Sequence, residues 1–488
     1  MSAEELIRGF IASLAALMIA WVIWDRSDNE LTPLTPEEPS RQRYAPYISN
    51  ALLPVLVWLI LVIGFVTKNV TLTLELWMSA CLGIFLHTSF YYLLLMLLIP
   101  VFRKYISARA CATLWLLPNY LYFTLHGSMQ LDRPAWVLPV SKTFISVFCV
   151  IWLAGFAVLM SRSCISHLIL RRRLLKNAVP VTDPEILALW KQIQLSAGYK
   201  KTPYRLVVSP DVATPLSVGF WKRTIRVILP RREYTPEELE LIFRHELVHI
   251  GREDSGTKFF FAFCTAMCWF NPLMWIAMGR SADDLELSCD ETVLLDADET
   301  QRRRYADLLL RTVGEASGFT TCLSASARTL RYRLQNVVRP RRRFSGALAV
   351  ALVFFLLILS CGYFSLSYPA GSGRELIFDG QDTALCAVNN INFDTPEGYA
   401  YATCRDPQAL CAYLQELEFY ALTGSYSFSN DENRIIIIFH GPKGAFGVNL
   451  TDHTLMITPL YDDTPQKTGY YLREAVDWEY IRSLLVIK

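Results

Sequence analysis

The sequence contains few charged residues for its length. Only 19% of the 488 residues are Asp, Glu, Lys or Arg, whereas 52% are hydrophobic. A typical soluble domain has about 25% charged residues. The deficit is concentrated in long apolar runs, which indicates a membrane protein that contacts the lipid bilayer. The net charge is only +2 and no long basic tract stands apart from the apolar runs, so we expect no nucleic-acid partner.

Pairs of cysteines separated by two residues are absent, which argues against a cysteine-based zinc site. Most of the twelve cysteines lie in or near apolar runs, where we interpret them as small buried hydrophobic residues. Cys386, Cys404 and Cys411 fall in the C-terminal region. An odd number cannot pair completely, and the sequence leaves open whether two of them form a disulfide.

Six apolar runs are long enough, or nearly so, for membrane helices, which need about 17–25 residues. They cover residues 6–24, 51–66, 78–101, 110–126, 143–165 and 345–367. No small-residue cleavage site follows the first run, because Asp25 and Arg26 come next, so we expect a retained helix there and not a signal peptide. The fourth run contains Pro118 and Asn119, and a re-entrant segment is the alternative to a span.

Positively charged residues predict the orientation of these runs, because they stay on the cytoplasmic side. Basic clusters follow the fifth run at positions 171–176 and precede the sixth at 339–343. We therefore divide the chain into a transmembrane region (1–169), a cytoplasmic domain (170–344), a last transmembrane helix (345–367) and an extracytoplasmic domain (368–488). The last domain should be a small α+β unit with a strand at 435–439 and a helix at 407–419.

Within the cytoplasmic region, the pattern predicts a helix over 183–197, short strands within 204–230, and another helix starting at Thr235. Thr235, Pro236 and Glu238 have the residue types and spacing of a capped helix N-terminus. One interpretation gives strand 224–230 an exposed edge, to which an extended peptide substrate could hydrogen-bond. An ordinary core strand is the alternative.

The sequence His245-Glu246-Leu247-Val248-His249 lies on this capped helix. Its two histidines are one turn apart on one face, a spacing at which two imidazoles can hold one zinc ion. Glu246 can act there as a general base toward water and then as an acid toward the leaving amine. The alternative is a helix whose histidines only satisfy local hydrogen bonds, but the capping and a plausible third ligand favour a zinc metalloendopeptidase.

A third metal ligand has to come from another part of the chain. No other histidine lies within 170–344, so two histidines and a glutamate are preferred. Glu286 can supply that ligand, while Asp290, four residues later, can accept a hydrogen bond from a ligand imidazole. The alternative is a solvated acidic helix surface. Asp254 is a further candidate for holding an imidazole or for a helix end, and Arg252 is a candidate for stabilising the oxyanion.

These motifs resemble those of the BlaR/MecR-type family of membrane zinc metallopeptidases. The resemblance rests on PLSVGF (215–220), VILP (227–230), HELVHIGRED (245–254), CWFNP (268–272) and ELSCDE (286–291). It extends over roughly residues 78–367. The resemblance implies a bacterial plasma-membrane protein in which an external signal activates a cytoplasmic protease. It also implies zinc bound by His245, His249 and Glu286, with Glu246 as the base.

The C-terminal region departs from this family, because residues 370–488 contain no S-x-x-K motif and are short for a penicillin-binding domain. The external ligand therefore stays unknown. The expected substrate is a protein, either a transcriptional repressor or the chain itself, and basic segment 329–343 is a candidate self-cleavage site. The sequence allows a homodimer. The alternative functions are a constitutive quality-control or maturation protease and a metal-stabilised receptor without proteolysis.

The fold class that we predict is thus a multi-pass α-helical membrane protein. It should carry a cytoplasmic α+β zincin-like (gluzincin-like) metalloprotease domain and a small extracytoplasmic α+β C-terminal domain.

Overall fold

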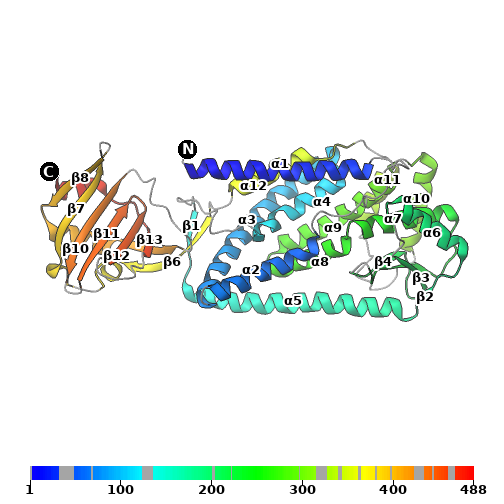
Figure 1. Ribbon diagram of the computed structural model, residues 1–488, viewed down its shortest axis with the longest axis horizontal. Helices are drawn as coiled ribbons and strands as arrows, with labels where there is room; N and C mark the ends of the chain where they lie inside the picture. The colour runs from blue at the N-terminus through cyan, green and yellow to red at the C-terminus, as the bar shows by residue number, and fades with distance from the viewer. Residues whose placement is uncertain are drawn as a thin grey trace.

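The structure is a computed structural model of the whole chain. It describes residues 3–31, 49–67, 70–123, 136–199, 204–220, 223–295, 297–314, 327–338, 343–360, 364–379, 382–395, 398–422, 433–441, 444–459 and 468–487. A β-rich unit lies at one end of an elongated molecule, long helices form the middle, and a smaller sheet with helices forms the other end (Figure 1).

Long helices dominate the N-terminal part, and they follow the apolar runs of the sequence. The elements are α1 (Ala3–Leu31), η1 (Asn50–Leu52), α2 (Leu53–Thr67), α3 (Val70–Tyr105), α4 (Ala108–Leu116), η2 (Leu117–Phe123), β1 (Trp136–Pro139) and α5 (Lys142–Lys176). Helix α5 is about 50 Å long at 1.5 Å per residue. It connects the β-rich end of the molecule to the opposite end (Figure 1).

Two of the described helical segments, Cys81–Tyr105 and Thr143–Lys176, are long and apolar enough to cross a membrane. Gly9–Asp25, Asn50–Val66 and Ala347–Ser360 are shorter apolar helices. The predicted run 110–126 forms α4 and then the 3-10 helix η2, both mostly buried, which is the interruption that Pro118 favours. Its residues 124–126 lie outside the described part of the chain.

Residues 170–344, for which the sequence predicts a cytoplasmic domain, contain the predicted helices and strands. This region comprises β2 (Val179–Pro180), α6 (Pro184–Ser196), β3 (Arg205–Ser209), β4 (Leu216–Val218), β5 (Arg226–Pro230), α7 (Pro236–Gly251), α8 (Asp254–Met267), α9 (Pro272–Val293), α10 (Glu299–Gly314) and α11 (Ala327–Val338). The sheet order is β2-β3-β5-β4, with β3 and β5 parallel and β4 antiparallel to β5.

This order corrects the prediction that strand 224–230 offers an exposed edge. β5 pairs with a neighbour on each side, and Val227, Ile228 and Leu229 are buried. Three consecutive apolar residues fit a strand that is covered on both faces, which is the core-strand alternative. The edge strand next to β5 is β4.

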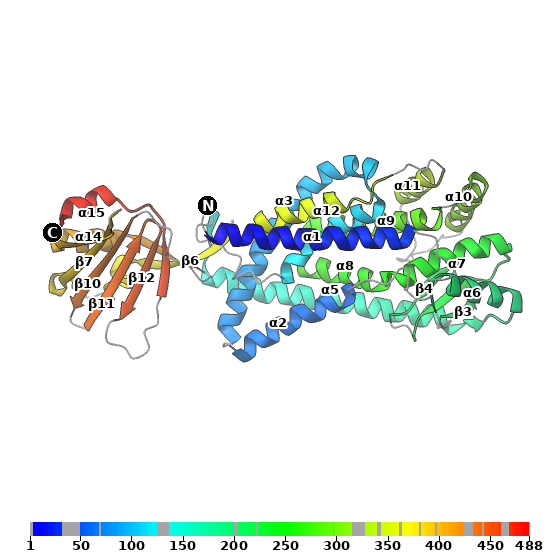
Figure 2. The same cartoon turned by 45° about the horizontal axis from the view of Figure 1, so that its top comes forward.

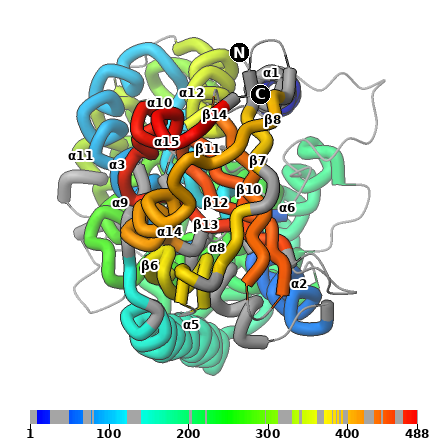
Figure 3. Tube along the Cα trace, turned by 90° about the vertical axis from the view of Figure 1, so that its left-hand side faces the viewer, coloured from blue at the N-terminus to red at the C-terminus, as the bar shows by residue number. Residues whose placement is uncertain are grey.

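The C-terminal part is a large mixed sheet with short helices. Its elements are α12 (Ala347–Ser360), β6 (Phe364–Ser372), α13 (Gly373–Leu376), η4 (Thr383–Leu385), β7 (Ala387–Thr395), β8 (Gly398–Cys404), α14 (Pro407–Glu416), β9 (Glu418–Leu422), β10 (Arg434–Gly441), β11 (Gly444–Thr451), β12 (Thr454–Pro459), β13 (Thr468–Leu472), α15 (Trp478–Leu484) and β14 (Leu485–Ile487). The strand order is β1-β6-β9-β13-β12-β11-β10-β7-β8-β14. Figure 3 shows this unit end-on, in front of the helices.

The predicted last helix over 345–367 is too long. The helix ends at Ser360, and strand β6 begins at Phe364, because the alternating sequence FSLSY followed by Pro369 suits a strand and not a helix. Residues 361–363 lie outside the described part. Cys386, Cys404 and Cys411 are free thiols, so no disulfide forms among them.

A single hydrophobic core joins the long helices to α8 and to the first half of α9. It contains side chains from α3 and α4, such as Tyr92 and Trp115, together with Phe260, Phe263 and Met274. Figure 2 shows α8 and α9 lying among the long helices. The core therefore crosses residue 170, at which the sequence predicts a domain boundary, and that boundary stays a prediction.

Two glycines permit a matched test of the packing. Gly346, before α12, has φ +80, and a Cβ there would lie 2.5 Å from the Ala110 Cβ. Gly279 in α9 has no atom within 4 Å of a Cβ position. We expect Gly346→Ala to lower the free energy of unfolding by more than about 1 kcal/mol, whereas Gly279→Ala should raise it by roughly 0.5–1 kcal/mol. Thermal unfolding of both variants in detergent measures these changes in stability. Equal changes in the two variants would contradict the close packing of the start of α12 against α4.

Candidate metal centre

Helix α7 brings His245, Glu246 and His249 into the site, and its N-terminus is fixed as the sequence predicts. The Thr235 hydroxyl accepts a hydrogen bond from the Glu238 backbone N–H, and the Glu238 carboxylate accepts one from the Thr235 N–H. This reciprocal capping fixes the first turn of the helix. Leu239, Phe243 and Leu247 pack one face of α7 into a core with β5, which orients the opposite face toward α9.

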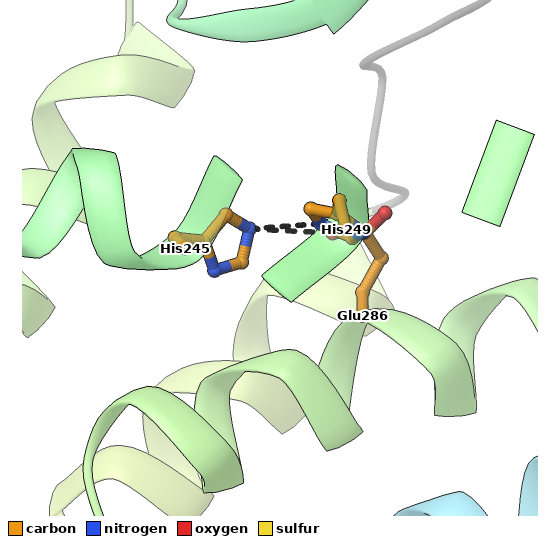
Figure 4. Close-up of side chains that lie close together, drawn as sticks. All are labelled: His245, His249 and Glu286. Atoms are coloured by element: carbon orange, nitrogen blue, oxygen red, sulfur yellow. Dashed lines mark hydrogen bonds and ion pairs between the residues drawn. The ribbon is translucent and has the colours of Figure 1, made fainter. Parts of the chain in front are cut away.

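The two imidazoles and one carboxylate converge on one point. His245 Nε2 lies 3.1 Å from His249 Nε2, and Glu286 Oε2 of α9 lies 3.5 Å from His249 Nε2 and 3.9 Å from His245 Nε2 (Figure 4). Tetrahedral zinc with bonds of about 2.0–2.1 Å places its ligand atoms roughly 3.3 Å apart. These residues therefore fit a zinc ion.

Hydrogen bonds fix the ring of His249. Its Nδ1–H donates to Asp254 Oδ2 at 2.6 Å, and the Cys289 sulfur lies 3.4 Å from the same nitrogen. With Nδ1 occupied in this way, Nε2 is the atom that faces the other two candidate ligands. Asp254 is also the first residue of α8, so it serves at a helix start and beside an imidazole, the two roles that the sequence suggested.

His245 is held by a longer chain of hydrogen bonds than the sequence predicts. Asp290 does not bond it directly, because Asp290 Oδ1 lies 3.7 Å from His245 Nδ1. The Tyr305 hydroxyl lies between them, 2.9 Å from His245 Nδ1 and 2.6 Å from Asp290 Oδ1. The tyrosine donates its hydroxyl proton to Asp290 Oδ1, so its oxygen is left to accept from His245 Nδ1–H. This arrangement directs Nε2 of His245 toward His249 Nε2 and Glu286.

The electrostatics suit a cation between the three groups. Burial and the neighbouring positive charge of His249 lower the pKa of His245 to about 3. Burial opposes the charge on His249, but Cys289, Glu286 and Asp254 together raise its pKa well above the usual value. Desolvation opposes ionisation of Glu286, yet His249 and Lys258 lower its pKa well below the usual range. The cluster thus pairs an ionised Glu286 carboxylate with a positively charged His249 ring, beside a neutral His245 ring.

Glu246 lies near the core face of α7, on the side where the helix contacts strand β4. Its carboxylate is buried and accepts a hydrogen bond from the Ser217 hydroxyl of β4. Burial raises the pKa of Glu246, against the effects of His249 and Ser217. A raised pKa favours a group that takes up and releases a proton near neutral pH.

Arg252, a candidate for stabilising the oxyanion, is buried and held against helix α9. Its guanidinium donates to Ser288 Oγ at 2.6 Å and to Thr292 Oγ1 at 2.7 Å, so it joins α7 to α9. Lys258 Nζ lies 3.3 Å from Glu286 Oε1. The sequence did not predict that four further residues surround the site: Ser217, Lys258, Tyr305 and Arg333. They lie on helices and strands other than α7, and no spacing rule relates those elements to α7.

Comparison with known proteins agrees with this geometry. Residues 128–337 match the family model described as BlaR1 peptidase M56, so this part of the chain is similar to the domains of that peptidase family. The match confirms the resemblance that the motifs indicated, and the chain carries a peptidase domain of the BlaR/MecR type.

Two curated relatives illustrate the extent of the similarity. The regulatory protein BlaR1 of Bacillus licheniformis is 27% identical over 195 residues, which are 40% of this chain and 32% of that protein. The methicillin resistance mecR1 protein of Staphylococcus aureus is 25% identical over 124 residues, 25% of this chain and 21% of that protein. The chain thus matches about a third of the length of the first relative and about a fifth of the second.

The hydrogen-bond chain to His245 gives a direct prediction. Tyr305→Phe removes the hydroxyl that links His245 to Asp290 and leaves the ring packing in place. We expect zinc affinity, measured by competition with a chelator, to fall by about 10–100-fold, as is typical when a partner of a metal-binding histidine is lost. Tyr332→Phe in α11 is the matched control, with unchanged affinity expected. Equal affinities for both variants would contradict the role of Tyr305.

Proposed function

We propose that the protein is a membrane-bound zinc endopeptidase that transmits an external signal by cleaving itself, a cytoplasmic regulator, or both. The observation that carries the proposal is the convergence of His245, His249 and Glu286 next to a buried Glu246. All four residues lie within the segment that matches the peptidase family model. In the proposal the two histidines and Glu286 bind the metal.

Glu246 has the surroundings of a general base. Bound zinc would supply a Lewis acid that polarises the scissile carbonyl and activates water. Glu246 lies one residue from the first candidate ligand and is held by Ser217. It takes the proton of the attacking water and delivers it to the nitrogen of the leaving amine. A site that only stabilises the fold has no need for such a base.

An extended polypeptide is the substrate that the edge of the small sheet supports. β4 lies at that edge among the described strands, and it also carries Ser217, the hydrogen-bond partner of Glu246. A peptide that adds to β4 by backbone hydrogen bonds would run past the carboxylate of the base. The strand-addition hypothesis thus moves from β5 to β4.

Membrane insertion is supported by the side chains that the long helices expose. Leu97 of α3, Val158 of α5 and Leu348 of α12 are among many large apolar residues on the surface. Apolar helix faces of this extent are unusual in water and suit contact with lipid. In the proposal the helices lie in a bacterial plasma membrane, with region 170–344 on the cytoplasmic side.

The sheet pairing supports an external C-terminal unit. β1, which precedes α5, pairs in parallel with β6, which follows α12. Segments joined in one sheet must lie on the same side of a membrane, and the positive-charge pattern predicts the outside for both. In this arrangement the external unit is connected to the peptidase region through two helices. Helix α5 leads into the first residues of that region, and α12 follows its last residues. The names of the relatives, a regulatory protein and a resistance protein, fit a role in signalling.

Glu246→Gln tests the proposed chemistry. The amide cannot accept the proton but keeps nearly the same shape, so we expect one bound zinc per chain and loss of proteolysis by at least about 100-fold. The measurement pairs zinc content with mass spectrometry of fragments from the full chain, co-expressed with candidate regulators. Glu240→Gln on the exposed face of α7 is the control and should cleave normally. Fragments of equal yield from Glu246→Gln would contradict the proposal.

A further inference from the structure

Helix α9 is held by arginines from three other segments. Asp284 pairs with Arg103 at the end of α3 at 2.8 Å, Asp290 pairs with Arg333 of α11, and Glu291 pairs with Arg343 before α12. Glu286, the candidate metal ligand, lies between the first two of these acidic residues. The charged contacts therefore connect the helix of the third ligand to segments that lead directly into the long apolar helices.

Arg333 of α11 lies beside the candidate metal centre. Its Nε lies 2.7 Å from Asp290 Oδ2 and its Nη2 lies 2.7 Å from Asp290 Oδ1, a two-point contact. Its Nη1 lies 3.8 Å from Glu286 Oε2. The side chain of Arg333 is 12% exposed and that of Asp290 is 2% exposed. Two parallel hydrogen bonds between a guanidinium and a carboxylate fix orientation as well as distance.

We propose that Arg333 is a positioning residue for the metal centre, which it reaches through Asp290 and Tyr305 and through its charge beside Glu286. This inference rests on the proposed metal-binding function. Arg333 fixes the Asp290 carboxylate, Asp290 accepts from Tyr305, and Tyr305 accepts from His245 Nδ1–H. The same guanidinium restrains the Glu286 oxygen that faces both imidazoles. One side chain thereby orients two of the three candidate ligands.

The position of Arg333 depends on the packing of the apolar helices. Phe344, between α11 and α12, donates its backbone N–H to the Tyr105 carbonyl at 2.9 Å and accepts from the Ser107 N–H at 2.9 Å. The guanidinium of Arg103 lies 5.4 Å from the ring centre of Tyr332, the neighbour of Arg333. Helix α11 is thus attached to the end of α3 and the start of α4.

This placement changes how segment 329–343 is interpreted. The sequence suggested an accessible linker with a self-cleavage site, yet Arg333 is nearly enclosed and Val337 is buried. Residues 339–342 lie outside the described part, so the cleavage hypothesis stays a prediction for them. Helix α11 itself contacts the candidate metal centre through Arg333.

The test uses the full chain in detergent and measures zinc affinity by chelator competition. Arg333→Gln leaves Asp290 without its partner, and we expect zinc affinity to fall by about 10–100-fold. Arg331→Gln, two residues earlier on the exposed face of α11, is the control and should bind zinc as the wild type does. Arg333→Lys keeps the charge but loses the two-point contact, so its affinity should lie between those of wild type and Arg333→Gln.

Two further readouts separate positioning from a general loss of structure. The visible spectrum of the Co²⁺-substituted protein reports the ligand geometry and should change in Arg333→Gln while the far-ultraviolet circular dichroism does not. In a double-mutant cycle with Tyr305→Phe, the two losses of affinity should combine to less than their sum, because both act through Asp290. Additive losses with an unchanged Co²⁺ spectrum would overturn the proposal.

The outcomes also distinguish this inference from the proposed function. If wild type and Arg331→Gln bind no zinc, the metallopeptidase proposal itself fails. If both bind zinc and Arg333→Gln binds it equally well, only the positioning role of Arg333 is overturned.

Discussion

The candidate metal centre depends on how the Nδ1 atoms of two histidines are held. An isolated imidazole can rotate and can present either nitrogen, so spacing along a helix does not by itself make a site. Here His249 Nδ1 is fixed by Asp254, and His245 Nδ1 is fixed by Tyr305. Both Nε2 atoms are thereby directed at one place, where Glu286 also arrives. Without these contacts, the two Nε2 atoms would not be directed at the same point.

These anchoring groups come from elements that only the tertiary fold brings together. Asp254 starts α8, Tyr305 lies on α10, and Glu286 and Asp290 lie on α9. Helices α8 and α9 share a hydrophobic core with α3, α4 and α5, so the apolar helices determine where the carboxylates are placed. The region that holds the candidate metal centre is therefore packed into the end of the helical part, and a shift of those helices relative to α9 would alter the geometry of the candidate ligands.

The sequence predicts the parts of this structure that local rules govern. The capping residues of α7, the helix at α6, the strands β3 and β5 and strand β10 follow from residue types and periodicity, and the structure contains all of them. The spacing of His245 and His249 indicates a shared face, and Glu286 and Asp290 could be selected because acidic residues four apart share a helical face. The motif resemblance to BlaR/MecR proteins is confirmed by the match over 128–337.

The wrong predictions concern features that depend on strand pairing or on contacts between residues far apart in the sequence. Strand 224–230 could not be identified as central from its own residues, since its neighbours β3 and β4 cover both edges. The end of the last helix was placed beyond Ser360, because the apolar composition continues into β6 although the period changes. A direct bond from Asp290 to an imidazole was expected, and the fold instead inserts Tyr305, which the sequence places on another helix.

The identity of the metal ligands can be tested by X-ray absorption at the zinc edge of the purified full chain. We expect two imidazole nitrogens at about 2.0–2.1 Å with oxygen completing the shell, and no sulfur. A sulfur scatterer at about 2.3 Å would show that a cysteine binds the metal, and it would make buried Cys289 a ligand in place of Glu286.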